Sequence, residues 1–232
     1  ERREDLITKI LGEELCAFPG KNCIYSDLGF ILLGYIVEQT TSMPLDCFFE
    51  KQILAPLAIG NDRIFFKKKA EHGESDFAPT GICSWSGKAL RGIVHDDNCR
   101  ALGGVAGHAG LFATLPGTLA FTQNLLLELQ GKGCRLGLSE EILGVFSRRE
   151  RGSGYVYGFD TPSPLGSSSG RHFSRLSFGH LGFTGTSFWI DLESSCGIVL
   201  LTNRVLSPDG LHSIKTLRPQ VHDLIRSYLK PC

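Results

Sequence analysis

Residues 180–203 read HLGFTGTSFWIDLESSCGIVLLTN, and this stretch decides the fold. Two apolar runs, at residues 187–191 and 197–203, flank a short polar segment. Apolar runs of this length on either side of a polar turn predict two antiparallel strands that form a hairpin in the core. The sequence therefore predicts an antiparallel sheet in the last third of the chain.

Several segments before and after this hairpin have apolar residues at helical spacing. Residues 28–37 are apolar on nearly every side, which predicts a helix buried on several faces. Asp27 is placed to cap that helix, so Tyr25 would lie just outside its N-terminus. Helices are also expected at residues 4–15, from Pro44 to Ala55, at 116–129 and after Pro219, with a short strand at 64–66. This order predicts the α+β class, in which an antiparallel sheet is flanked by helices and joined by a helical subregion, as a single domain over residues 1–232.

The charge balance, hydropathy and cysteine pattern of the sequence limit the partners and the cellular compartment that we expect. With 24 basic and 24 acidic residues the net charge is zero, so no basic field favours nucleic acid. No apolar stretch approaches the ~18 residues that a membrane span requires, and no signal peptide opens the chain. The eight cysteines are scattered without a C-x-x-C pair, which favours free thiols in a reducing, cytoplasmic compartment.

One segment combines imidazole and carboxylate groups. His95, Asp96, Asp97 and Asn98 are consecutive, and such side chains together suit zinc or manganese. Adjacent residues of an extended chain point to opposite faces, so they rarely bind one ion without ligands from elsewhere. The sequence predicts no metal and no cofactor.

Three motifs, in this order, carry a family resemblance. Tyr25-Ser26-Asp27 precedes the apolar helix, residues 103–110 are glycine-rich, and His180-Leu181-Gly182 precedes the hairpin. This series resembles the penicillin-recognising serine hydrolases, the group of class C β-lactamases, D-Ala-D-Ala peptidases and related esterases. The first motif is similar to their Tyr-x-Asn box and the last to their Lys-Thr-Gly box in its His-Thr-Gly form.

The resemblance implies three catalytic positions. Tyr25 would transfer the proton of a serine nucleophile, and the positive end of the helix dipole beside it would favour the phenolate. His180 would stand where many relatives have lysine, and because histidine is mostly neutral at pH 7 it would supply less positive field. The backbone N–H of Phe183, on an edge strand, would provide one half of the oxyanion hole.

Four further positions would contact substrate by the same resemblance: Ser26, Asp27, Gly182 and Thr184. Gly182 would let substrate approach the strand closely. Two positions depart from the family pattern. Asp27 replaces an asparagine and can only accept hydrogen bonds when ionised, and Leu181 replaces a threonine and removes a hydroxyl. Both changes favour an ester or a different peptide over a β-lactam as the substrate.

The nucleophile of this family belongs to a Ser-x-x-Lys motif upstream of the tyrosine. Residues 1–24 contain no serine, and the one literal match, Ser227 to Lys230, comes after the other motifs and is read as coincidence. We therefore expect an N-terminally truncated, inactive part of a serine hydrolase acting on a small ester, amide, β-lactam or peptidoglycan-like peptide. The alternative is a non-catalytic binding or scaffold protein that keeps the fold. The sequence does not determine the oligomeric state.

Overall fold

A computed structural model describes residues 3–66, 73–133, 135–147 and 154–229. The chain divides into two compact units, one of residues 1–55 and 60–113, the other of residues 56–59 and 114–232. The single domain expected over residues 1–232 stays a prediction.

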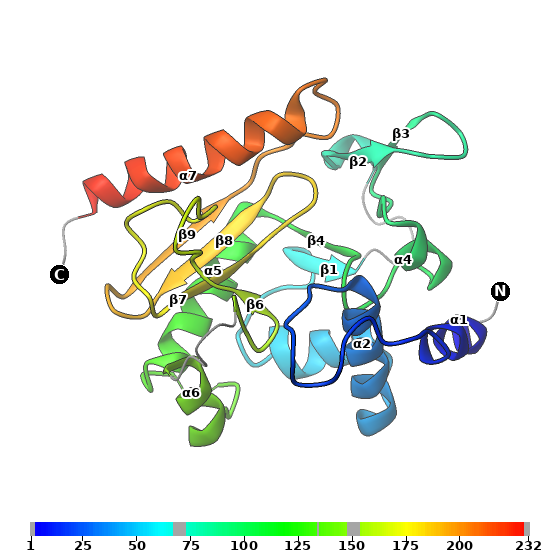
Figure 1. The fold of residues 1–232 in the computed structure, drawn as a ribbon, viewed down its shortest axis with the longest axis horizontal. Helices are drawn as coiled ribbons and strands as arrows, with labels where there is room; N and C mark the ends of the chain where they lie inside the picture. Colours follow the sequence, from blue (N-terminus) through cyan, green and yellow to red (C-terminus); the bar gives the residue numbers. More distant parts are fainter. Residues whose placement is uncertain (1–2, 67–72, 134, 148–153, 230–232) are drawn as a thin grey trace. The chain divides into compact units, whose positions relative to one another are not determined.

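The first unit contains most of the helices expected from the first half of the sequence. Its helices are α1 (Arg3–Leu11), α2 (Asp27–Thr41), α3 (Leu45–Phe48), which continues into the π-helix η1 (Phe49–Leu54), and α4 (Asp97–Ala101) (Figure 1). Buried residues of α1, α2 and α4, together with two that follow α4, form one cluster, consisting of Ile7, Ile10, Ile31, Cys99, Leu102 and Ala106. The helix α1 ends four residues earlier than predicted, where Gly12 follows and its N–H donates to the carbonyls of Thr8 and Lys9.

Two of the expectations for α2 are corrected. Its N-cap is Ser26, whose hydroxyl oxygen accepts a hydrogen bond from the N–H of Gly29, and Asp27 is the first helical residue. Only Ile31 and Gly34 are buried, whereas Leu33 and Ile36 are each 55% exposed. The helix is therefore buried on one face within this chain and not on several.

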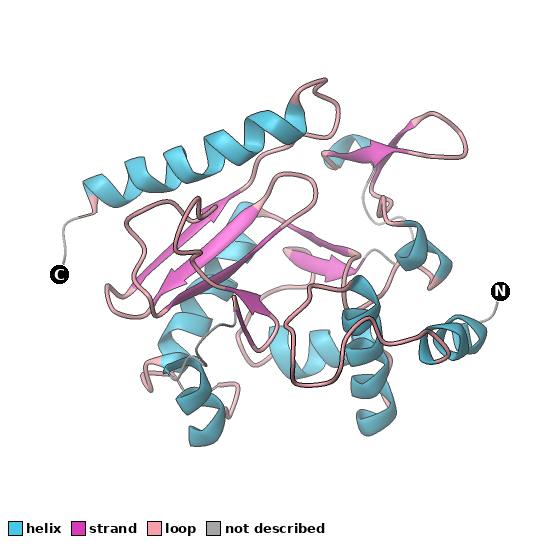
Figure 2. Cartoon of the chain, viewed as in Figure 1, coloured by secondary structure: helices cyan, strands magenta, loops and turns pink. Residues whose placement is uncertain are grey.

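Short strand pairs complete the first unit. Strand β1 (Ile64–Phe66) pairs antiparallel with β4 (Leu111–Ala113), and β2 (Pro79–Ile82) pairs with β3 (Ala89–Arg91). Figure 2 shows both pairs as small ribbons, and a 3₁₀ turn η2 (Glu74–Asp76) precedes β2. Strand β1 confirms the predicted strand at residues 64–66.

The second unit is built on an antiparallel sheet in the order β5-β6-β7-β8-β9. Its strands are β5 (Tyr155–Val156), β6 (Phe159–Asp160), β7 (Ser177–Leu181), β8 (Ser187–Asp191) and β9 (Cys196–Leu200). The predicted hairpin is β8–β9, with Ser187 opposite Leu200 and Asp191 opposite Cys196. The predicted α+β class, with an antiparallel sheet and helices, is confirmed.

Helices cover both faces of this sheet, because its strands alternate buried side chains between two clusters (Figure 1). Phe178 and Ile190 pack with Leu125 and Leu126 of α5 (Leu115–Leu129) and with Phe146 of α6 (Glu140–Ser147). Trp189 and Ile198 occupy the opposite face with Phe173, and Ile225 of α7 (Gly210–Tyr228) packs against them. No helix among the residues described in either unit is long and apolar enough to cross a bilayer.

The last helix begins earlier than predicted. Helix α7 starts at Gly210 and contains Pro219 in its interior, although the sequence pattern placed the start after that proline. An interior proline destabilises a helix by ~3 kcal/mol. Buried contacts on both sides of Pro219 oppose this cost, since Arg218 donates to the carbonyl of Thr186 and His222 hydrogen-bonds the hydroxyl of Ser187.

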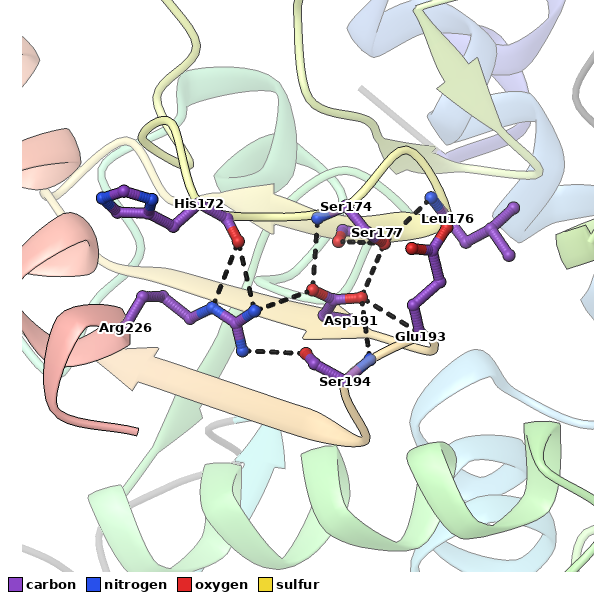
Figure 3. A network of polar contacts seen from close by, with 8 residues as sticks. All are labelled: His172, Ser174, Leu176, Ser177, Asp191, Glu193, Ser194 and Arg226. Carbon is purple, nitrogen blue, oxygen red and sulfur yellow. Dashed lines mark hydrogen bonds and ion pairs between the residues drawn. The ribbon is translucent and has the colours of Figure 1, made fainter. Parts of the chain in front are cut away.

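A buried carboxylate ties α7 to the ends of the sheet. Asp191 is fully buried at the end of β8, and it accepts hydrogen bonds from the N–H and hydroxyl of Ser174, from the N–H groups of Glu193 and Ser194, and from Arg226 (Figure 3). Arg226 also donates to the carbonyl of His172. Burial alone raises the pKa of Asp191, but hydrogen bonds from Ser174 and Ser194 outweigh it and hold that pKa below its ordinary value.

Candidate active site

The predicted site residues fall into two groups, one in each unit. Tyr25, Ser26 and Asp27 belong to the first unit, whereas residues 180–186 belong to the second. The convergence of the two groups on one site stays a prediction.

Tyr25 lies immediately outside the N-terminus of α2, as the sequence predicted. Tyr25 is 48% exposed, and its ring centroid is 5.8 Å from that of Phe30, one turn into the helix. The cap hydrogen bond of Ser26 fixes the entry of the chain into α2. Tyr25 therefore directly precedes the N-cap of a helix of 15 residues, at the end where the helix dipole is positive.

The glycine-rich segment packs against the same helix. A side chain at Gly107 would lie 2.1 Å from the carbonyl oxygen of Phe30, so only glycine permits this contact. Next to it, the His108 side chain is 2% exposed, and its Nε2 lies 2.7 Å from Oδ1 of Asp96. Asp96 also caps α4 by accepting from the N–H of Cys99. The segment that suggested a metal site therefore braces the glycine-rich segment, and no cluster of three metal-ligating side chains occurs among the residues described.

His180 lies on β7, half-buried, with its Nδ1 2.9 Å from its neighbour's carbonyl oxygen at Leu181. It stands opposite Phe188 of β8.

The sequence analysis missed Asp160, an acidic residue near His180. Asp160 pairs with Gly179 across the β6–β7 ladder, and its pKa is raised by burial, against smaller lowering effects of the Thr161 N–H and of His180. No motif identifies Asp160, because the pairing of two-residue strands has no periodic signal.

Phe183 corrects one prediction about its position. Strand β7 ends at Leu181 and lies between β6 and β8, so Phe183 belongs to the β7–β8 turn and not to an edge strand. Phe183 is 59% exposed. The Phe183 N–H, which was predicted to stabilise an oxyanion, therefore lies at a corner of the sheet. The hydrogen bonds of the turn, and not those of a strand ladder, set its direction.

Glycine is required at two positions of this turn. A side chain at Gly182 would lie 2.0 Å from Oγ1 of Thr186, and Gly185 has a φ of +115°. The N–H of Gly182 donates to the carbonyl of Thr186 at 2.8 Å, and the N–H of Gly185 donates to the carbonyl of Gly182 at 3.0 Å. The absence of a side chain at Gly182 thus serves the closure of the turn, a role that the sequence analysis did not foresee.

Two arginines that the sequence analysis missed contact the same turn. Arg204 donates from Nε to the carbonyl of Phe183 at 2.6 Å and from its backbone N–H to the carbonyl of Thr184 at 2.8 Å. Its guanidinium carbon lies 4.5 Å from the centroid of the Phe183 ring. Arg218, which is 6% exposed, donates from Nη2 to the carbonyl of Thr186 at 3.1 Å. Neither arginine belongs to a motif, so only the fold brings them to the turn.

The literal Ser-x-x-Lys match in α7 does not form an activated nucleophile within the described structure. The hydroxyl of Ser227 donates to the carbonyl of Leu224, one turn earlier in α7. Its partner in the literal Ser-x-x-Lys match, Lys230, lies outside the described residues. The bond to Leu224 is a local helix contact and does not link the hydroxyl to a base.

Comparison with known proteins gives consistent results. A family model described as Beta-lactamase matches residues 1–221. Proteins named "Putative D-alanyl-D-alanine carboxypeptidase" are 32% identical in Escherichia coli O157:H7 and 31% identical in Escherichia coli strain K12. Each alignment is 211 residues long and covers 82% of this chain and 47% of the relative. The chain thus spans about half the length of the curated relatives it matches.

Solved structures share the fold at lower identity. A β-lactamase of Mycobacterium bovis superimposes with a TM-score of 0.61 and 17% identity, covering 91% of this chain and 66% of that chain. The D-amino acid amidase of Ochrobactrum anthropi SV3 gives a TM-score of 0.60 and 19% identity, covering 90% and 59%. These similarities establish the β-lactamase/transpeptidase-like fold.

Proposed function

The chain belongs to the β-lactamase family, and from that premise we propose that it forms the C-terminal part of a serine hydrolase that works through an acyl-enzyme. The serine would come from a Ser-x-x-Lys segment upstream of Tyr25, and residues 1–24 contain no serine. Because curated relatives are named for a D-alanyl-D-alanine carboxypeptidase activity, the substrate class is an acyl compound such as a short peptide, amide or ester. Asp27 and Leu181 depart from the family pattern and favour an ester or an unusual peptide.

The observation that carries this proposal is the β7–β8 turn. Gly182 directs its carbonyl into the turn, where the N–H of Gly185 donates to it. In a trans peptide the carbonyl and the following N–H point in opposite directions, so the N–H of Phe183 points out of the turn. An outward backbone N–H at a fixed corner of a sheet suits the stabilisation of an oxyanion.

The proposed reaction assigns a role to each group. Tyr25 accepts the proton of the serine hydroxyl as the oxygen attacks the substrate carbonyl, and the negative charge that develops on the carbonyl oxygen is stabilised by the Phe183 N–H and by the N–H of the serine itself. Collapse of the tetrahedral intermediate breaks the bond to the leaving group, which takes the proton from Tyr25. Water then hydrolyses the acyl-enzyme and regenerates the serine. His180 contributes field and hydrogen bonds near the turn.

A labelling experiment tests the proposal. We expect residues 1–232 alone to show no covalent labelling by a fluorophosphonate probe, and we expect the chain joined to its own upstream coding region to be labelled at one serine. Tyr25→Phe in that longer protein should slow labelling by ~10²–10⁴-fold, because it removes a proton-transfer group. Labelling of Ser227 in the isolated chain, or no labelling of the longer protein, would contradict the proposal. The second of these outcomes would favour a non-catalytic binding protein.

A further inference from the structure

The β7–β8 turn is held from outside by residues that follow the sheet in the sequence. Arg204 binds two successive carbonyls of the turn, those of Phe183 and Thr184, and covers the exposed Phe183 ring. A side-chain donor that is charged makes a hydrogen bond roughly twice as strong as a neutral one. The contact at 2.6 Å between Nε of Arg204 and the Phe183 carbonyl is of this kind.

The remaining carbonyls of the turn are also engaged. Gly185 accepts from the hydroxyl of Thr202 at 2.6 Å, and Thr186 accepts both from the N–H of Gly182 and from Arg218. Each carbonyl from 183 to 186 therefore accepts a hydrogen bond from within the protein. The negative ends of these peptide dipoles face internal donors, two of them cationic.

This arrangement determines where the positive ends of the dipoles point. The Phe183 carbonyl is directed to Arg204, so the following N–H, that of Thr184, is directed away from Arg204. The adjacent peptide, Gly182–Phe183, is fixed by the turn hydrogen bond to Gly185. If Arg204 were absent, the Phe183–Thr184 peptide could rotate and the Phe183 ring would lose its cationic contact, so the bond to Gly185 would have to hold the Gly182–Phe183 peptide and its N–H alone.

We propose that Arg204 is a positioning residue for the oxyanion donor, which it holds by anchoring the Phe183 carbonyl and stacking on the Phe183 ring. This inference rests on the proposed function. Arg204 does not contact the reacting atoms in the proposed reaction. Its effect is to keep the Phe183 N–H in the direction that a developing oxyanion requires, so that the peptide need not reorganise during the reaction.

The experiment compares three variants of the chain joined to its upstream region: Arg204→Ala, Arg204→Lys and the control Arg171→Ala. The control removes an arginine of the same unit whose side chain is 84% exposed and paired with Asp223 instead of with a carbonyl of the turn. Steady-state turnover of p-nitrophenyl acetate gives kcat and KM. A thermal melt of each variant identifies an assay temperature at which all of them are folded.

We expect Arg204→Ala to lower kcat about 10- to 100-fold with KM changed less than about twofold, a smaller loss than the ~10²–10³ seen when an oxyanion donor is deleted. Arg204→Lys should recover part of the loss, because it keeps the charge but lacks the planar fork. Millimolar guanidinium should restore activity to Arg204→Ala but not change Arg171→Ala. A purely structural role would lower thermal stability without this kcat loss or rescue.

The possible failures are distinguishable. If the wild-type protein is not labelled by the fluorophosphonate probe, the proposed function itself fails. If the wild type is labelled and Arg204→Ala keeps wild-type kcat, only the positioning role is overturned. If Arg204→Ala does not fold, the folded Arg204→Lys variant decides, because lysine keeps the charge but lacks the planar guanidinium that stacks on the Phe183 ring. A wild-type kcat in Arg204→Lys would then overturn the inference. A reduced kcat at unchanged KM would support it.

Discussion

Replacing Asp191 with asparagine tests whether the buried carboxylate holds the second unit together. Asparagine offers one acceptor oxygen in place of two, and it removes the charge that faces Arg226, whose Nη2 lies 3.2 Å away. Breaking a buried charge pair by changing one partner costs ~3–5 kcal/mol. Arg226 keeps its bonds to the His172 carbonyl and the Ser194 hydroxyl, so the lower end applies, about 3 kcal/mol at pH 7. That loss corresponds to a decrease in Tm of roughly 6–12 °C.

The dependence on pH gives this prediction a second readout. Because the pKa of Asp191 is lower in the folded protein than in the unfolded chain, its contribution to stability is present above the unfolded value of ~3.9 and is lost as the pH falls through the folded value. Asparagine does not titrate. The gap in Tm between wild type and Asp191→Asn, measured by circular dichroism, should therefore narrow below about pH 4. Asp209→Asn, an exposed aspartate whose side chain makes no cap hydrogen bond, serves as the control. A gap under about 2 °C at pH 7, or one that is unchanged at pH 3.5, would refute the reasoning.

Three further expectations concern the backbone and the surface. Gly179→Ala should prevent cooperative folding, since the added Cβ would lie 2.1 Å from the carbonyl oxygen of Phe188. Gly29→Ala in α2, where no atom lies nearer than 3.9 Å to the added Cβ, should instead raise the free energy of unfolding by ~0.5–1 kcal/mol. Chemical denaturation of both variants tests this pair. Pro219→Ala should raise Tm by a few degrees, because it restores an N–H to the interior of α7, and an unchanged or lower Tm would mean that the helix requires the proline. The isolated chain should associate through the exposed apolar side chains of α2, and a clean monomer in size-exclusion chromatography with a sharp melt would contradict this.

The elements that the sequence predicted best are those with a strong local period. The β8–β9 hairpin follows from apolar runs on both sides of a polar turn, and it needs no contact from elsewhere to be recognised. Strands β5 and β6 have two residues each, too few to show alternation, so they were not predicted. The start of α7 was misplaced because a proline usually lies at a helix start, whereas tertiary contacts of Arg218 and His222 hold this one in the interior.

The candidate site shows the same division. Tyr25 could be placed from a motif and a helix start that are adjacent in the sequence. Arg204 and Arg218 are separated by 21 and 32 residues from the carbonyls that they bind, at Phe183 and Thr186, and nothing in their own sequence surroundings indicates that contact. Main-chain acceptors leave no trace in residue types, because every residue has a carbonyl. The partners of a turn held in this way can be found only from the fold.

A turn secured through its carbonyls also leaves its side chains open to change. Gly182 and Gly185 are constrained by close approach and by backbone angle, but the hydrogen bonds of residues 183 and 184 belong to the main chain. The Phe183 ring is also held by its contact with Arg204, but substitutions at Thr184 can alter the size and polarity of the turn surface while the path of the backbone is kept. A library that changes the surface of this turn without disturbing its backbone should therefore vary Thr184 and leave the glycines, Phe183 and Arg204 untouched.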